Sequence, residues 1–171
     1  FEPNPVLVRG VEQRFATNDR MHIYQKALGS RDEPVEFNVL NYAPSSSILA
    51  PDAINHKYHG DKMDIAQKIQ VDMCRLDSVI DTDIDIYKLD LQGYELAALE
   101  GSVALLPRTK IILTEIEFAS LYQSQPLFGD IDVFLRAQGF FLFNLYDLFT
   151  HPDGQLTAGD AMYLNSRFYK Q

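Results

Sequence analysis

Stretches typical of β-strands alternate with stretches typical of helices along most of this chain, and this alternation is the strongest constraint on its fold. Strand patterns cover residues 21–28, 34–40, 69–76, 84–91 and 110–118, and helix patterns cover residues 5–17, 93–106 and 127–138. Such alternation predicts an α/β domain with a mostly parallel sheet, helices on both faces and right-handed crossovers. The last two predicted strands, residues 140–146 and 161–165, have no helix pattern between them, so the final strand is expected to run antiparallel.

The sequence has the size and composition of one folded domain. Its 171 residues are 46% hydrophobic, which is enough for one substantial core, so we expect residues 1–171 to form a single domain. The net charge of −9 opposes binding to nucleic acid or to anionic lipid. No apolar run approaches the roughly 20 residues needed to span a membrane. The single cysteine, Cys74, excludes an internal disulfide, and a soluble, cytoplasmic domain is expected.

The longest segment without a clear pattern is residues 41–68, which is polar and contains three consecutive serines at 45–47. Only a weak helical pattern is visible, near residues 63–68. A connector of this length is uncommon in a compact domain and is typical of a lid or a substrate loop. His56 in this segment is a candidate general base, because histidine titrates near neutral pH, and an exposed loop residue is the alternative interpretation.

Polar residues follow three predicted strands at the edge where open parallel sheets bind ligands, beyond the carboxyl ends of the strands. Glu2 lies at the first of these ends, residues 27–29 lie at the second, and Asp90 lies at the third. A carboxylate at a strand tip can accept hydrogen bonds from both hydroxyls of a ribose, so Glu2 is a candidate ribose ligand. The alternative for Glu2 is a solvated carboxylate near a helix N-terminus.

The stretch from Lys88 to Glu95 places several polar groups where a strand meets a helix. Lys88 and Asp90 are two residues apart, so they share one face of the strand and could pair. The backbone N–H groups of Gln92 and Gly93 open the helix. Asp90 is therefore a candidate site residue, with a helix cap or a structural ion pair as the alternative. Glu95 is interpreted as a charge in the first turn of the helix.

Two glutamates at the end of the strand at 110–118 form a further candidate group. Glu115 and Glu117 are two residues apart and so lie on one face of the strand. They could contact a substrate hydroxyl or a metal ion, or they could form a solvated rim. The candidate catalytic residues from the whole chain are Asp90, Glu115 and His56.

Six short motifs occur in the order and spacing found in FkbM-type methyltransferases. They are FEPNP at 1–5, ALG at 27–29, RLD at 75–77, KLDLQGYE at 88–95, LEG at 99–101 and TEIEF at 114–118. The chain resembles this family along essentially its whole length. The resemblance implies the Rossmann-like class I fold that depends on S-adenosylmethionine, with seven strands of which the last runs antiparallel.

The resemblance also implies which residues contact the cofactor. Glu2 is assigned to the ribose, Ala27 and Leu28 lie beside the adenine, and Asp90 lies near the methionine end and the reacting methyl. Four further residues are candidate cofactor contacts: Pro3, Asn4, Gln92 and Gly93. A serine pair similar to one in the run at 45–47 lies beside the cofactor pocket in the family.

The family's first strand and its glycine-rich G-x-G loop would precede Phe1, so we expect an N-terminally incomplete methyltransferase domain that lacks both. The implied function is transfer of a methyl group from S-adenosylmethionine to a hydroxyl oxygen of a small molecule or glycan, with no metal ion. Two alternatives stay open. One is a catalytically inactive methyltransferase-like module that serves in binding or as a scaffold. The other is a nicotinamide-dependent oxidoreductase, although the chain has no G-x-G-x-x-G motif.

Overall fold

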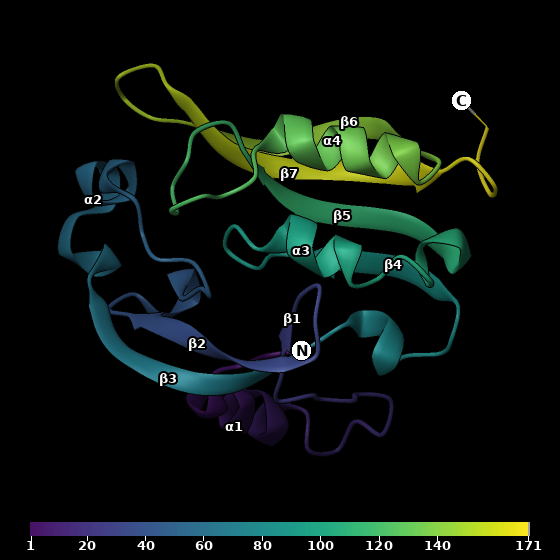
Figure 1. Ribbon diagram of the computed structural model, residues 1–171, viewed down its shortest axis with the longest axis horizontal. Helices are drawn as coiled ribbons and strands as arrows, with labels where there is room; N and C mark the ends of the chain where they lie inside the picture. Colours follow the sequence, from purple (N-terminus) through teal and green to yellow (C-terminus); the bar gives the residue numbers. More distant parts are fainter. Residues whose placement is uncertain (171) are drawn as a thin grey trace.

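Two mixed β-sheets and four α-helices make up the part of the chain that the computed structural model describes, residues 1–170. One sheet has the strand order β1-β3-β2 and comprises β1 (Ala27–Leu28), β3 (Ile65–Cys74) and β2 (Glu33–Leu40). The other has the order β4-β5-β7-β6 and comprises β4 (Ile84–Leu89), β5 (Thr109–Glu117), β7 (Leu156–Asn165) and β6 (Phe140–Thr150). Figure 1 shows the two sheets one above the other.

The α/β class is confirmed, but the expectation of a mostly parallel sheet is wrong for residues 1–170. β1 pairs with β3 and β4 with β5 in parallel, whereas β2 with β3, β5 with β7, and β6 with β7 are antiparallel. Only residues 29–32 separate β1 from β2, which is too short for a crossover, so the chain simply reverses there. The predicted reversal at the end of the chain is confirmed, because β7 runs antiparallel to both of its neighbours.

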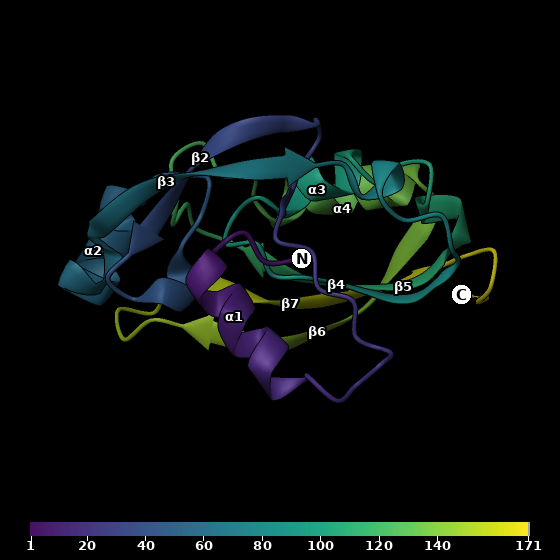
Figure 2. The same cartoon turned by 90° about the horizontal axis from the view of Figure 1, so that it is seen from below.

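The helices begin and end largely where local chemistry directs. α1 (Pro5–Arg14) starts after Asn4, whose side-chain oxygen accepts a hydrogen bond from the backbone N–H of Val6 at 2.9 Å. α4 (Phe128–Ala137) coincides with the helix pattern predicted at 127–138. Together with α3 (Glu95–Glu100), it covers one face of the four-stranded sheet (Figure 2). α2 (Ala53–His59) lies in the long polar segment. Short 3₁₀ turns complete the set: η1 (Ala43–Ser45), η2 (Gly60–Met63), η3 (Leu76–Ser78) and η4 (Leu106–Arg108).

One local expectation is wrong, and two hold for only part of their length. The strand predicted at 21–28 is reduced to Ala27–Leu28, because these two residues pair with β3, whereas residues 21–26 belong to neither sheet and are exposed or half-buried. The helix predicted at 93–106 ends at Glu100. The weak helical pattern at 63–68 lies mostly in β3, which pairs with β2 from Ile65 onward. Strand pairing decides the first and third cases, whereas α3 ends because Gly101, which has a low helix propensity, follows Glu100 as its C-cap.

The core consists of two apolar clusters. The larger lies between α3, α4 and the four-stranded sheet, and Leu89, Leu99, Ile112 and Leu135 are all fully buried in it. The smaller is centred on β1 and β3. Among residues 1–170 no helix combines the length and the apolar character that crossing a membrane requires.

Two glycines let the segment after β1 meet the end of α3. The N–H of Gly29 donates to the carbonyl of Cys74 at 3.0 Å, and the carbonyl of Gly101 accepts from the N–H of Asp77 at 3.2 Å. A side chain at Gly101 would collide with the backbone carbonyl of Gly29. The two segments can therefore touch backbone to backbone only while position 101 has no Cβ.

We expect Gly101→Ala to destabilise the protein by about 1–3 kcal/mol, because the new methyl group would overlap rigid backbone. Gly10→Ala is the matched control, and its expected effect on the free energy of unfolding has the opposite sign. Gly10 lies inside α1 with open space around it, so alanine there should stabilise by about 0.5–1 kcal/mol. Urea denaturation of both variants measures the difference, and an unchanged midpoint for Gly101→Ala would contradict the close packing.

Candidate functional site

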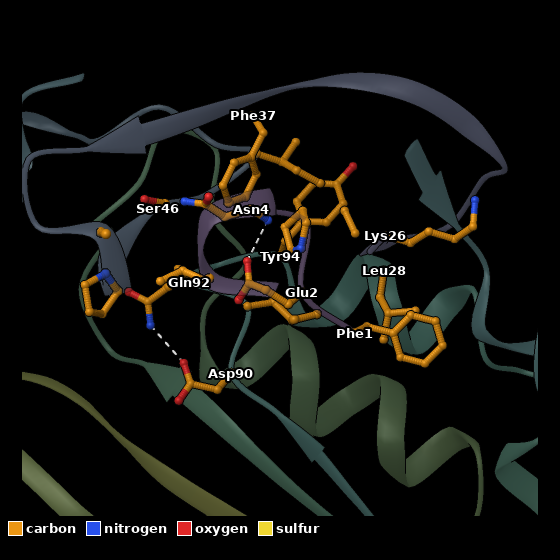
Figure 3. Close-up of a pocket in the computed structure, with 17 residues that line it drawn as sticks. Phe1, Glu2, Asn4, Lys26, Leu28, Phe37, Ser46, Asp90, Gln92 and Tyr94 are labelled. Carbon is orange, nitrogen blue, oxygen red and sulfur yellow. Dashed lines mark hydrogen bonds between the residues drawn. The ribbon is translucent and has the colours of Figure 1, made fainter. Parts of the chain in front are cut away.

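A cavity of about 300 Å³ opens between the N-terminal segment, β1, the loop before α2 and the turn after β4 (Figure 3). Seven of the eight residues predicted to bind cofactor line it, namely Glu2, Pro3, Asn4, Ala27, Leu28, Asp90 and Gln92. Gly93 is the exception, because it lies buried behind the turn. The structure thus brings together residues that are almost 90 positions apart in the sequence.

Glu2 is held at one side of this first cavity by its own backbone neighbours. Its N–H donates to the carbonyl of Tyr24 at 3.0 Å, and its carboxylate Oε1 accepts from the N–H of Asn4 at 2.7 Å. Partial burial raises the pKa of Glu2, and the Asn4 N–H partly offsets this rise. Figure 3 shows the carboxylate facing the same hollow as Asp90 and Gln92.

Gln92 connects the turn after β4 to three other parts of the molecule. Its side-chain Nε2 donates to Asp90 Oδ1 and to Glu115 Oε2, each at 2.9 Å. Its Oε1 accepts from the hydroxyl of Tyr122 at 2.9 Å, and its carbonyl accepts from Ser47 Oγ at 2.8 Å. The backbone of Gln92 is in the left-handed region, with φ of 54°, a conformation that costs a non-glycine residue free energy and that these bonds hold in place.

Glu95 supports the same turn from beneath. Its Oε1 accepts from the N–H of Leu91 at 2.6 Å and from the N–H of Gly93 at 3.3 Å. The side chain is only 1% exposed, and this burial raises the pKa of Glu95 to about 7. Glu95 lies in the first turn of α3, as predicted, but its carboxyl group is buried and holds the turn after β4 from inside.

Glu115 and Glu117 lie on β5 directly behind this turn. Burial, together with the charges of Asp90 and Glu95, raises the pKa of Glu115 to about 8. Burial, together with the charges of Glu95 and Glu115, raises the pKa of Glu117 to about 9. The alternative of a solvated rim is wrong for Glu117, which is 2% exposed, whereas Glu115 is half-buried. Within residues 1–170, no three His, Cys, Asp or Glu side chains are grouped so as to hold a metal ion.

Glu117 is the more isolated of the two glutamates. It is 2% exposed, and its Oε2 has no hydrogen-bond partner among the described residues. The amide of Gln125 faces the carboxyl group and lowers its pKa somewhat, but Gln125 Nε2 also lacks a hydrogen bond of acceptable geometry. A buried carboxyl group with so little support favours the protonated form.

A second cavity of about 530 Å³ lies on the other side of the turn. Its lining comes from the loop and helix at 42–63, from β5 and the loop after it, and from β6 and β7. Asp90 and Gln92 line both cavities and so form a wall common to the two. Glu115 and Tyr122 line the second cavity only.

The polar segment at 41–64 contributes to both cavities, although not through the predicted histidine. His56 lines neither cavity, and its Nε2 lies 3.2 Å from Asp64 Oδ1 on the surface. His59, one helical turn later, lines the second cavity instead. Of the serine run, Ser46 lines the first cavity and Ser45 the second.

Sequence reasoning missed Tyr122. Its hydroxyl shares one proton between two acceptors, the carbonyl of Ser45 at 2.8 Å and Gln92 Oε1 at 2.9 Å, so it ties the loop before α2 to the common wall. The residue sits in an irregular segment after β5, and its 2% exposure is set entirely by contacts distant in sequence. No local signal marks it.

Comparison with known families agrees with this geometry. The family model described as the methyltransferase FkbM domain matches residues 1–142. The chain belongs to the FkbM methyltransferase family. Glu2 and the Lys88–Glu95 turn both lie within the matched region of this FkbM domain. No strand ends at Glu2 in the structure, because residues 1–4 are irregular.

Two known proteins are similar to this FkbM domain. The 2-O-methyltransferase NoeI of Sinorhizobium fredii (strain NBRC 101917 / NGR234) is 28% identical over 145 residues, which is 78% of this chain and 59% of that relative. The crystal structure of methyltransferase FkbM from Methylobacillus flagellatus KT aligns with a TM-score of 0.54 and 16% identity, covering 95% of this chain and 35% of the other. The second likeness shows the fold alone. The chain spans less than two thirds of each of these proteins.

We expect Glu117→Gln to change how the stability of this FkbM domain depends on pH. In the unfolded chain the carboxyl group ionises near pH 4.5, whereas in the folded chain the pKa is about 9. The stabilisation from holding the proton is therefore complete below pH 4.5 and is lost as the pH rises toward 9. Glutamine keeps the shape without the ionisation, so the variant should gain about 1–3 kcal/mol over the parent at pH 8.5 and little at pH 4.5.

Urea denaturation at pH 4.5, 7 and 8.5 measures this effect. Glu12→Gln is the matched control, because Glu12 is an exposed glutamate on α1 and its replacement should leave the pH profile unchanged. A Glu117→Gln profile parallel to that of the parent protein would contradict the burial of an uncharged carboxyl group.

Proposed function

We propose that this domain transfers a methyl group from S-adenosylmethionine to an oxygen atom of a small-molecule or glycan acceptor, within a class I methyltransferase fold. The observation that carries the proposal is that two cavities share Asp90 and Gln92 as a wall, with the carboxylate of Glu2 lining the first of them. A group-transfer enzyme needs such a pair of adjoining sites, one for each reactant. Membership of a methyltransferase family and the likeness to a 2-O-methyltransferase support methyl transfer to oxygen.

The residues of the first cavity fit a nucleoside with a charged tail. Glu2 supplies an anionic acceptor suited to ribose hydroxyls. Ala27, Leu28 and Phe37 line the cavity with buried apolar surface suited to an adenine ring. Asp90 lies at the common wall, where a carboxylate would favour the positive sulfonium and the amino group of the methionine end.

When bound, S-adenosylmethionine supplies a methyl group already activated by the positive sulfur. The chain's own residues then have to align an acceptor hydroxyl with that methyl group and receive the hydroxyl proton. Alignment falls to the wall of Asp90 and Gln92, which Glu95, Tyr122 and Ser47 hold rigid. Well-oriented reactants can reach effective molarities on the order of 10⁵ M, so positioning can provide most of the rate.

Glu115 is the residue best placed to receive the proton. It lines the second cavity, and Gln92 fixes one of its carboxylate oxygens. A pKa of about 8 lies close to cellular pH, which is where a general base is most effective. His56 is withdrawn as a candidate base because it lines neither cavity and contacts Asp64 on the surface.

Glu2→Gln should weaken binding of S-adenosylhomocysteine roughly tenfold or more, because hydrogen bonds to a charged group are worth about 1.5–3 kcal/mol. Titration calorimetry of the full-length protein that contains this domain measures the affinity, with Glu12→Gln as the control that should bind normally. Unchanged affinity in Glu2→Gln would contradict the ribose role. A parent protein that shows neither binding nor thermal stabilisation by the ligand would support the inactive scaffold module instead.

Glu115→Gln should lower the rate of methyl transfer and abolish the rise of that rate with pH. In the parent enzyme, turnover should rise as the pH increases through about 8, since only the ionised carboxylate can accept a proton. The glutamine variant cannot ionise, so its rate should stay low and flat over the same range, roughly 10²-fold or more below the parent. S-adenosylhomocysteine affinity is the control and should be retained, because Glu115 does not line the first cavity.

A further inference from the structure

We infer that the second cavity binds an uncharged or cationic ring that carries hydrogen-bond donors, and that it excludes acceptors bearing a carboxylate or phosphate. This inference rests on the proposed function, because it treats the second cavity as the site of the methyl acceptor. It goes further in assigning a charge preference to that site. The carboxyl groups, the cationic groups and the aromatic rings that line the cavity support this preference.

Carboxyl groups dominate the polar lining. Asp90, Glu115, Asp147 and Asp160 contribute four of them, from the turn after β4 and from β5, β6 and β7. Asp90 and Asp160 both lie near the ammonium group of Lys88, at 3.5 and 3.3 Å, but Lys88 does not line the cavity itself. Aspartate carboxylates only accept hydrogen bonds, and Glu115 joins them once it loses its proton at a pKa of about 8, so the lining favours a ligand that brings hydroxyl or amine donors.

The positive groups of the lining are fewer and come from one segment. Lys62 and His59 both lie on the loop and helix at 53–63. Burial, with the charges of His151 and Lys62, lowers the pKa of His59 below its ordinary value, so this imidazole is largely neutral at pH 7. The lining therefore has one ammonium group, that of Lys62, beside several carboxyl groups. A carboxylate or phosphate on a buried acceptor would not find enough partners there to replace its hydration.

The negative electrostatic potential at the wall formed by Asp90 and Gln92 supports the same charge preference. The charges of Asp90 and Glu95 add to the effect of burial in raising the pKa of Glu115. Any other negative group placed beside Glu115 would meet the same repulsion. A hydroxyl on the acceptor would instead donate its proton toward that carboxylate, which is also the direction that methyl transfer requires.

Two half-exposed aromatic rings also line the second cavity. Tyr42, on the loop before α2, and Phe149, on β6, line the cavity from different elements, and each is 50% exposed. Large aromatic side chains left half exposed at a cavity are suited to pack against a flat ring face. Their electron-rich faces also favour a cation over an anion.

Three probes that share one sugar ring test the inference. They are methyl α-glucopyranoside, glucosamine and glucuronic acid, which are neutral, cationic and anionic at pH 7. Binding to the full-length protein saturated with S-adenosylhomocysteine is measured by ligand-observed NMR titration. The neutral and cationic probes should bind at least roughly fivefold more tightly than glucuronic acid. Equal or tighter binding of glucuronic acid, or no binding of any probe, would overturn the inference.

Paired variants locate the effect. Phe149→Ala should weaken binding of the neutral probe roughly fivefold, whereas Phe143→Ala should not, because Phe143 is a 59% exposed phenylalanine on the same strand that lines neither cavity. Asp147→Asn should reduce the difference in binding affinity between glucosamine and glucuronic acid. Asp81→Asn, which removes an exposed carboxylate distant from the cavity lining, should leave that difference unchanged. Equal responses within either pair would overturn the assignment.

The affinity for S-adenosylhomocysteine, measured on the same samples, separates the two proposals. If the parent protein does not bind S-adenosylhomocysteine, the proposed function is contradicted, whatever the sugar probes do. Normal affinity combined with no discrimination among the probes would overturn the charge preference alone.

Discussion

The hydrogen-bonded turn after β4 is the feature on which both cavities depend. Glu95 fixes the backbone of this turn from inside the domain, and the Gln92 side chain joins it to β5 and to the loop before α2. Because Gln92 occupies a left-handed backbone conformation, the turn would relax if these contacts were removed. The same few atoms thus form the wall that separates and aligns the two proposed binding sites.

This arrangement has an electrostatic cost. Three glutamates, Glu95, Glu115 and Glu117, lie buried within one region, and each raises the free energy of ionising the others. Such a cluster weakens the fold at alkaline pH rather than strengthening it. Buried ionisable groups of this kind concentrate at functional sites, where a shifted pKa is useful for chemistry. The cluster lies against the common wall, which is where the proposed proton transfer requires it.

Much of the fold and part of the site could be predicted from local patterns. The α4 stripe, the Asn4 cap and the reversal of the last strand follow from periodicity, capping chemistry and the missing crossover, and all three are present. The strand predicted at 21–28 is present only at Ala27–Leu28, where β3 supplies a partner, and the helix predicted near 63–68 is wrong because the chain from Ile65 onward pairs with β2. His56 failed for a related reason, since the orientation of α2 directs His59 to the cavity instead.

The sequence by itself determined that Ala27 and Asp90 lie at strand ends, because strand and helix periodicities depend only on neighbouring residues. Tertiary structure alone decided that Glu2, Ala27 and Asp90 face one cavity, that Asp90 and Gln92 also border a second, and that Tyr122 joins the wall. The physical reason is that burial and cavity shape arise from contacts between segments tens of residues apart. Those contacts depend on the docking of whole elements, as where the missing side chain of Gly101 admits the backbone of Gly29.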